Sequence, residues 1–351
     1  MKVYLKAYMA QNVGDDLYLH LMLQKHPEIQ FFMLPEEFED QYRKTFRQYP
    51  NAVVIRKKDV YWRLKNKLEK GGLARYLLRK CDAVLYLGGS LFMENPKNDE
   101  WDRTLAEEVA YCNARHIPYH IRSCNFGPYQ TERYRTEKEA LFCKLATIYF
   151  RDRYSYQMFL HLAQAAYIPD AVFAYSLPKV PKKEKTFGIS VIQPDRRRGL
   201  KPFQDSYYAF IAAEIERQAE AGYSATLFDF CTSEGDAKAA EQILRLLPQE
   251  TRAQCRLISY TGDMPAFLKS YLSMERTLCT RFHAMILSAM AGQAFCPLFY
   301  SDKMLHVVQD LSLCGHYLNI RALDNSLTPV YRPSADLAHL SREAEKMTLL
   351  P

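Results

Sequence analysis

Several common sequence features are missing from this chain of 351 residues. Residues 1–6 lack the apolar core of a secretory signal, and the acidic Asp15 and Asp16 follow too early for one. No window holds the roughly 20 apolar residues that a membrane-spanning helix needs. The nine cysteines include no C-x-x-C pair, which disfavours a zinc site or a redox dithiol. We therefore expect a cytoplasmic protein with no metal and no cofactor.

A strong excess of one charge is also missing, since the formal net charge is only +7. Lysines and arginines are spread along the chain, and no nucleic-acid-binding motif is present, so we expect no nucleic-acid partner. The mild positive charge fits either an ordinary solvated surface or attraction for anionic ligands and anionic lipid. Peripheral contact with the inner face of a membrane is therefore one expectation.

Strand-like and helix-like segments alternate through most of the sequence, and residues 178–185 interrupt them with prolines and charge. This pattern predicts an N-terminal Rossmann-like domain at 1–178, a linker at 179–185 and a C-terminal Rossmann-like domain at 186–334. The helix expected within 335–351 could pack on either domain. The predicted fold class is α/β, with two doubly wound sheets facing across a cleft.

The most informative stretch is residues 276–292. A short strand ends near Cys279, a small-residue helix covers 284–290, and Gly292 is placed to end that helix. Arg281 and His283 would then lie at the carboxyl end of a strand, where open α/β sheets bind ligands. His283 can transfer a proton near neutral pH, although it could equally cap a helix or hydrogen-bond in a core.

Other polar motifs also follow predicted strands, at residues 12–16, 88–90, 125–128, 151–152 and 300–303. Gly88 and Gly89 would let backbone amides approach an anion, or they could form a simple tight turn. Arg151, Arg281 and Lys303 would supply positive charge for a phosphate or carboxylate, whereas Arg151 with Asp152 could also be a surface ion pair.

Taken in order, these motifs resemble the polysaccharide pyruvyl transferase family over nearly the whole chain. The family elements N-x-G-D-D, R-D-x-x-S, R-L-H-A and Y-x-x-K correspond to residues 12–16, 151–155, 281–284 and 300–303. Residues 85–89 match a family strand that ends in a Gly-Gly turn. Two departures are Ser90 in place of a further glycine and Asn125 at the start of the G-x-G-P-like loop.

The resemblance implies a glycosyltransferase-B-like pair of domains that transfers a pyruvyl group from phosphoenolpyruvate to sugar hydroxyls, forming a ketal and releasing phosphate. It also implies that Arg151, His283 and Lys303 bind phosphoenolpyruvate, and we add Arg281, Gly88 and Gly89 to that set. His283 is our candidate general acid. Asp15 or Asp16 would orient or deprotonate the acceptor hydroxyl, unless they only cap a helix. Asn12, Gly14 and Asn125 are expected on the acceptor side.

Two other functions stay open at this point. A nucleotide-sugar-dependent glycosyltransferase can have the same architecture, and a noncatalytic relative could bind glycans. The joint presence of Arg151, His283 and Lys303 favours the pyruvyl transferase. The acceptor would be a sugar of a cell-surface polysaccharide, either free or as a lipid-linked precursor, and nothing in the sequence identifies it.

Overall fold

We analysed a computed structural model, which describes residues 1–69, 72–95, 99–313, 315–324, 326–334 and 336–348. The chain divides into two compact units. The first contains residues 1–9, 15–174 and the C-terminal residues from Leu340, and the second contains Ala10–Gly14 and Tyr175–His339. We describe each unit by itself.

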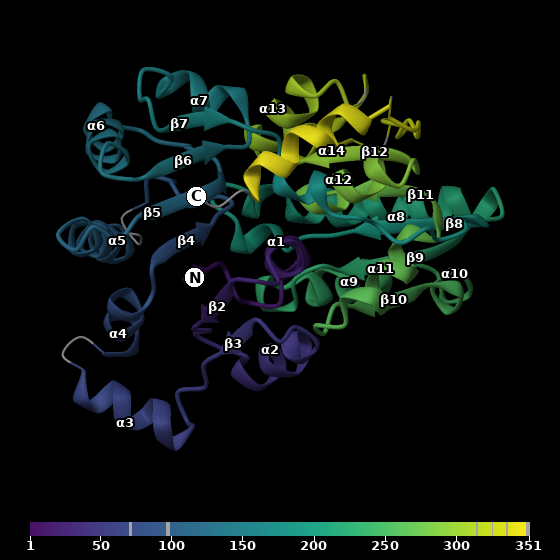
Figure 1. The fold of residues 1–351 in the computed structure, drawn as a ribbon. Coiled ribbons are helices and arrows are strands. Elements are labelled where there is room, and N and C mark those ends of the chain that lie inside the picture. Colours follow the sequence, from purple (N-terminus) through teal and green to yellow (C-terminus); the bar gives the residue numbers. More distant parts are fainter. Residues whose placement is uncertain (70–71, 96–98, 314, 325, 335, 349–351) are drawn as a thin grey trace. The chain divides into compact units, whose positions relative to one another are not determined.

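A seven-stranded parallel sheet forms the centre of the first unit (Figure 1). Its order is β3 (Ala52–Val54), β2 (Gln30–Met33), β1 (Lys2–Lys6), β4 (Ala83–Leu87), β5 (Tyr119–Cys124), β6 (Thr147–Phe150) and β7 (Ala165–Tyr167). Every residue of β4 and β5 is buried, as expected for strands covered by helices on both faces. The order reverses between β1 and β4, which makes this pair the switch point of the sheet.

Helices cover both faces of this sheet. The first unit contains α1 (Val13–Lys25), α2 (Glu39–Thr45), α3 (Val60–Leu68), α4 (Gly72–Lys80), α5 (Asp99–Asn113), α6 (Glu132–Phe142) and α7 (Arg153–Met158). Side chains of α4, α5 and α6 share one core with β4, β5 and β6. Right-handed crossovers place α1 and α2 on the opposite face. The last helix, α14 (Ala338–Ala344), contacts this unit, since Ser341 Oγ donates to the Phe173 carbonyl at 2.8 Å.

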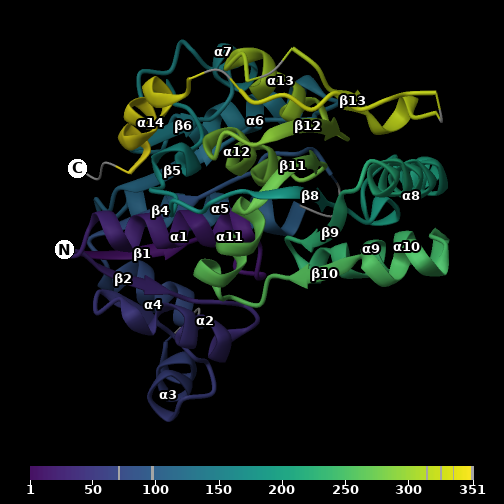
Figure 2. The same cartoon turned by 90° about the vertical axis from the view of Figure 1, so that its right-hand side faces the viewer.

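The second unit is built on a six-stranded parallel sheet (Figure 2). Its order is β10 (Arg256–Ser259), β9 (Ser224–Asp229), β8 (Lys183–Ser190), β11 (Met274–Cys279), β12 (Ala294–Phe299) and β13 (Leu318–Asn319). Its helices are α8 (Gln204–Glu220), α9 (Asp236–Leu246), α10 (Gln249–Gln254), α11 (Met264–Leu272), α12 (Phe282–Met290) and α13 (Asp302–Asp310). The switch point lies between β8 and β11. The predicted class, α/β with two doubly wound sheets, is confirmed.

Two local features differ from the predicted domain limits. Residues Ala10–Gly14, expected in the first domain, belong to the second unit, because Val13 N donates to the Phe230 carbonyl at 3.0 Å and Ser233 Oγ donates to the Ala10 carbonyl at 3.1 Å. Residues 183–185, expected in the linker, are the first residues of β8, where Lys183 pairs with Met274 of β11. The side chains of residues 183–185 are charged and exposed, so the sequence of this segment resembles that of a linker.

Sequence inspection missed several short elements, namely β7, α10, α11, α13 and β13. Of these, α11 had a visible start signal, because Asp263 precedes it and accepts a hydrogen bond from Ala266 N at 3.0 Å. The two short strands contain three and two residues. They are too short to show a hydrophobic period, so only pairing with a neighbour defines them.

Two buried histidines make the first unit sensitive to acid. His20 Nδ1 lies 2.8 Å from the Tyr49 hydroxyl, and His120 Nδ1 lies 2.8 Å from Thr147 Oγ1. The Nε2 atom of each ring has no hydrogen-bond partner among the described residues. Burial lowers the pKa of each imidazole to about 4. Both rings are therefore neutral in the folded protein at pH 7.

We predict that these histidines lower stability as the pH falls from about 6.5 to about 4, because the unfolded chain binds protons there that the folded unit does not. Each contributes at most about 3 kcal/mol. Urea unfolding of a His20→Gln/His120→Gln variant should show a smaller loss of unfolding free energy across this range than wild type. His161→Gln, which changes a half-exposed ring, is the control. An unchanged pH profile in the double variant would contradict the prediction.

Candidate functional site

In the first unit, the predicted residues Gly88, Gly89 and Asn125 follow two neighbouring strands of the sheet, β4 and β5. Asn125 N donates to the Gly89 carbonyl at 3.0 Å. A Cβ atom on Gly88 would lie 2.5 Å from Leu91 Cδ1, so a larger residue there would require the Leu91 side chain to move. A Cβ atom on Gly89 would lie 3.7 Å from Arg151 Nη2 and 3.9 Å from Asp15 Oδ1. The structure therefore brings Gly89, Asn125, Arg151 and Asp15 together.

Arg151 is buried at the end of β6, where its guanidinium is tightly coordinated. Nη1 donates to Asp170 Oδ2 at 3.0 Å and to the Tyr18 hydroxyl at 3.2 Å, and Nη2 donates to Asn125 Oδ1 at 3.0 Å. Asp170 is fully buried. Although burial lowers the pKa of Arg151, Tyr18 and Asp170 raise it above the usual value. The guanidinium therefore has structural partners on three residues, and its predicted role in donor binding stays a prediction.

Asp15 and Asp16 lie in the first turn of α1 and have different surroundings. Asp16 is fully buried and accepts a hydrogen bond from the Tyr42 hydroxyl at 2.9 Å. Asp15 is 9% exposed and faces Gly89. Just before them, Asn12 Oδ1 accepts a hydrogen bond from Gly14 N at 3.0 Å, which organises the start of the helix.

In the second unit, Arg281 follows β11 at the switch point, and carboxylates surround its guanidinium. Nε donates to Asp236 Oδ2 at 2.8 Å, Nη2 donates to Asp236 Oδ1, and Nη1 donates to Glu234. Asp236 is fully buried. Burial alone raises the pKa of Glu234, but Arg281 and Arg197 outweigh it and hold this pKa at about 2. Ser190 Oγ of β8 also accepts a hydrogen bond from Arg281 N at 3.1 Å.

His283 is the second residue of α12, and Gly14 lies directly against its ring. A Cβ atom on Gly14 would be 1.6 Å from His283 Nδ1, so only glycine fits beside the imidazole in this position. The Phe282 ring contacts the imidazole edge-on at 5.0 Å between centroids. The ring is partly exposed and sits at a helix N-terminus, where the helix dipole favours an anion.

Lys303 is the second residue of α13, which follows β12, the strand paired with β11. It therefore has the same position in α13 as His283 has in α12. Its Nζ atom lies 6.0 Å from the centroid of the Tyr300 ring, and the Arg197 guanidinium lies 5.4 Å from the same centroid. Burial raises the pKa of the Tyr300 phenol, but Lys303, Arg197 and Arg281 outweigh burial and lower that pKa overall. The sign of this shift reports a strongly positive environment around Tyr300.

Sequence inspection missed several members of these clusters, namely Tyr18, Arg197, Glu234 and Asp236. Arg197 had a weak signal, because it lies in a run of three arginines after the strand that became β8. Tyr18 and Asp170 are 152 positions apart, and nothing in the sequence links them. Their side chains meet because α1 and the segment after β7 both pass beside Ser123 and Arg151, which hydrogen-bond to the two residues.

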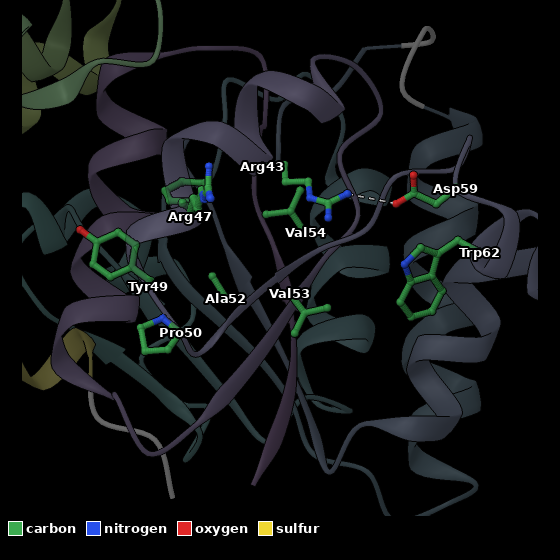
Figure 3. Close-up of a pocket in the computed structure, with 10 residues that line it drawn as sticks. Arg43, Arg47, Tyr49, Pro50, Ala52, Val53, Val54, Asp59 and Trp62 are labelled. Atoms are coloured by element: carbon green, nitrogen blue, oxygen red, sulfur yellow. Dashed lines mark hydrogen bonds and ion pairs between the residues drawn. The ribbon is translucent and has the colours of Figure 1, made fainter.

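Other kinds of site were sought in the described part of the chain. No group of three or more His, Cys, Asp or Glu side chains there could hold a metal ion. None of the described helices is long and apolar enough to cross a membrane. An open cavity of about 420 Å³ lies beside α3, but none of the predicted site residues lines it. Figure 3 shows Asp59 and Trp62 on one side of this cavity and Arg47, Tyr49 and Pro50 on the other.

We predict that Arg151→Met lowers the free energy of unfolding by about 3–5 kcal/mol, because it leaves the buried Asp170 carboxylate without its cation. Arg153→Met, at the next exposed arginine, should cost less than about 1 kcal/mol. Arg151→Met/Asp170→Asn should recover part of the loss, as measured by urea unfolding. Equal stability of Arg151→Met and wild type would show that the pair does not stabilise the fold.

Comparison with solved structures shows similarity to enzymes that act on nucleotide sugars. The UDP-GlcNAc 2-epimerase from Methanocaldococcus jannaschii is 8% identical with a TM-score of 0.58, and 99% of each chain is covered. The Neisseria meningitidis UDP-GlcNAc 2-epimerase bound to UDP-GlcNAc is 13% identical with a TM-score of 0.53, covering 87% of this chain and 85% of that one. Anabaena HepE in complex with UDP and glucose is 10% identical with a TM-score of 0.53, covering 99% and 94%.

At these identities the similarity establishes the fold alone. A search among curated proteins found no match. The family model described as polysaccharide pyruvyl transferase, by contrast, matches residues 12–302, which include every predicted site residue except Lys303. This span covers well over half of the 351 residues. The chain therefore belongs to the polysaccharide pyruvyl transferase family.

Proposed function

We propose that this protein transfers the pyruvyl group of phosphoenolpyruvate to hydroxyls of a sugar in a cell-surface polysaccharide or its lipid-linked precursor. The product would be a pyruvate ketal, and phosphate would be released. The observation that carries the proposal is the placement of His283 and Lys303. Each is the second residue of a helix, and the two helices follow the paired parallel strands β11 and β12.

This placement suits a donor that carries both a phosphate and a carboxylate. The N-termini of α12 and α13 favour anions, and Lys303 adds a full positive charge beside Tyr300. The lowered pKa of Tyr300 indicates that the cations here outweigh the carboxylate of Glu234. We assign donor binding to His283 and Lys303, whereas donor contact by Arg151, Gly88 and Gly89 stays a prediction from the sequence.

The proposed reaction needs one proton delivered to carbon. Protonation of the phosphoenolpyruvate methylene by His283 develops positive charge on the neighbouring carbon, which the first sugar hydroxyl attacks. A second hydroxyl then replaces the phosphate, closing the ketal. One hydroxyl proton is regained by the catalytic acid, and the other leaves with phosphate, so the protons balance. A positioned acid of this kind contributes roughly 10²–10⁴ to the rate.

Burial and hydrogen bonding support different proposed roles for the other predicted residues. Asp16 is fully buried and bonded to Tyr42, so we propose Asp15 as the carboxylate that orients or deprotonates the acceptor. The guanidinium of Arg281 donates to Asp236 and Glu234. We therefore propose that Arg281 positions the start of α12 instead of binding the donor. Asn12 and Asn125 remain proposed acceptor-side residues, and Gly14 positions His283.

The donor can be tested directly with the purified chain. Incubation with phosphoenolpyruvate and a panel of sugar acceptors should release phosphate and add a pyruvyl ketal detectable by mass. Phosphoenolpyruvate alone should raise the melting temperature, because a ligand that binds only the folded state stabilises it. Strong protection by UDP-sugars, with none from phosphoenolpyruvate, would instead support a nucleotide-sugar-dependent glycosyltransferase.

The acid role of His283 has its own prediction. His283→Gln should lower kcat by roughly 10²–10⁴ while changing donor affinity much less. In D₂O the wild-type enzyme should place deuterium in the methyl group of the ketal. Thermal unfolding of the variant checks that the fold is intact. A raised KM with unchanged kcat would show that His283 binds the donor and delivers no proton.

The contact between Gly14 and His283 gives a further prediction. Gly14→Ala would place a methyl group within 1.6 Å of the present Nδ1 position, so the imidazole must move. A displacement of about 1 Å can cost about 10²-fold in turnover. Gly315→Ala is the matched control, because a Cβ atom there meets nothing within 4 Å. Wild-type turnover in Gly14→Ala would show that the ring position is not critical.

A further inference from the structure

Helix α3 (Val60–Leu68) presents its apolar side chains to solvent. Val60 is 73% exposed, Tyr61 55%, Leu64 54% and Leu68 72%, and the helix contains no buried residue. In an ordinary surface helix the apolar residues face the core. In Figures 1 and 2, α3 projects from the first unit beyond α2 and α4. The exposed residues are therefore a feature of this helix that packing within the unit does not explain.

The apolar residues are arranged as one stripe. At 3.6 residues per turn, Val60, Leu64, Leu68 and Tyr61 fall within an arc of about 100°. The opposite side attaches the helix to the unit. There the Trp62 ring contacts the Tyr76 ring at 6.2 Å between centroids, and Asn66 Oδ1 accepts a hydrogen bond from Leu73 N at 2.9 Å. The stripe consequently points away from the fold.

Basic side chains flank the stripe on both edges. Arg63 and Lys67 follow one edge on the helical wheel, and Lys65 follows the other, with its Nζ 5.6 Å from the Tyr61 ring centroid. Residues 56–68 contain six basic residues and one acid, Asp59. The neighbouring cavity adds Arg43 and Arg47, of which Arg43 pairs with Asp59 at 3.3 Å (Figure 3). Arg56 and Lys58 both pair with Asp40, and Arg56 also pairs with Asp59. The positive charge beside the stripe therefore comes mainly from Arg63, Lys65 and Lys67 on the helix itself.

An apolar helical stripe bordered by cations matches the physical requirements of the interface of an anionic bilayer. The aliphatic side chains enter the boundary between headgroups and acyl chains, while lysine and arginine stay among the phosphates. We propose that α3 is a membrane-docking helix that binds bilayers rich in anionic lipid. Tyr61, which lies on the stripe and is 55% exposed, is of the type that favours the interfacial region.

This inference goes beyond the proposed transferase activity and does not depend on it. Charge complementarity distinguishes the bilayer from other occupants, because a second copy of this chain would bring a like-charged helix to the same stripe. Docking through α3 would hold the protein at the surface where a lipid-linked acceptor is carried. A protein that docks but transfers no pyruvyl group would refute the proposed function and leave this inference standing.

The test is flotation of the full chain with vesicles of phosphatidylcholine containing about 30% phosphatidylglycerol, compared with phosphatidylcholine alone. We expect binding to the anionic vesicles that weakens with salt. Leu64→Glu/Leu68→Glu should reduce the partition coefficient at least about tenfold. Arg63→Gln/Lys67→Gln should reduce binding to anionic vesicles by about tenfold or more. Both variants should melt like wild type, since neither changes a buried residue.

A matched control tests whether replacing any pair of exposed leucines would have the same effect on vesicle binding. Leu160 and Leu246 are 60% and 55% exposed on other parts of the chain, so Leu160→Glu/Leu246→Glu should bind vesicles like wild type. Equal binding by the Leu64→Glu/Leu68→Glu variant would overturn the proposal. So would absence of vesicle binding by wild type, or sedimentation showing that the same variant converts a dimer to a monomer, which would assign the stripe to a second copy.

Discussion

A buried arginine whose charge is neutralised by carboxylates anchors the ligand-side loops of each sheet. Arg151 pairs with Asp170 in the first unit, and Arg281 pairs with Asp236 and Glu234 in the second. A guanidinium taken out of water must be matched by hydrogen bonds and opposite charge, or the fold pays several kcal/mol. Each pair therefore requires segments from different strands to end in fixed positions.

These arginines change how the family motifs are understood. In sequence, Arg281 and His283 look like one functional pair, yet the structure gives them different tasks. Arg281 is bonded to carboxylates and holds the turn after β11, whereas His283 begins α12 against Gly14. Lys303 contacts the Tyr300 ring and helps to lower the pKa of its phenol. His283 and Lys303, to which we assign donor binding as a proposal, are each the second residue of a helix that follows one of these strands.

Helix α3 shows a different use of the same kinds of residues. Its cations flank exposed apolar groups, so their charge is not consumed by a buried carboxylate. Such a surface contributes nothing to the stability of the unit, because none of its residues is buried. The residues of this surface are therefore constrained only by what the surface binds, and otherwise they are free to vary. The loops after the strands and α3 therefore differ in physical character: the loops are organised by buried charge, and α3 presents exposed apolar area.

The sequence by itself determined the α/β class and the positions of the central strands. The strand predicted to end near Cys279 and the helix predicted over 284–290 correspond to β11 (Met274–Cys279) and α12 (Phe282–Met290), because an apolar run and a glycine that ends a helix are visible in local sequence. It also placed the polar motifs directly after strands. The family followed from the order of those motifs, which depends on local sequence alone.

Tertiary structure decided the strand order and the task of each polar residue. Parallel neighbours such as β1 and β4 are about 80 residues apart, and nothing local specifies that they pair. Gly14 touches His283, and Tyr18 bonds to Asp170, only after the sheets have formed. Whether a side chain is charged, and which groups it can contact, depends on its burial and on its partners. Because those partners come from distant segments, the distinction between Asp15 and Asp16, or between Arg281 and His283, exists only in the folded chain.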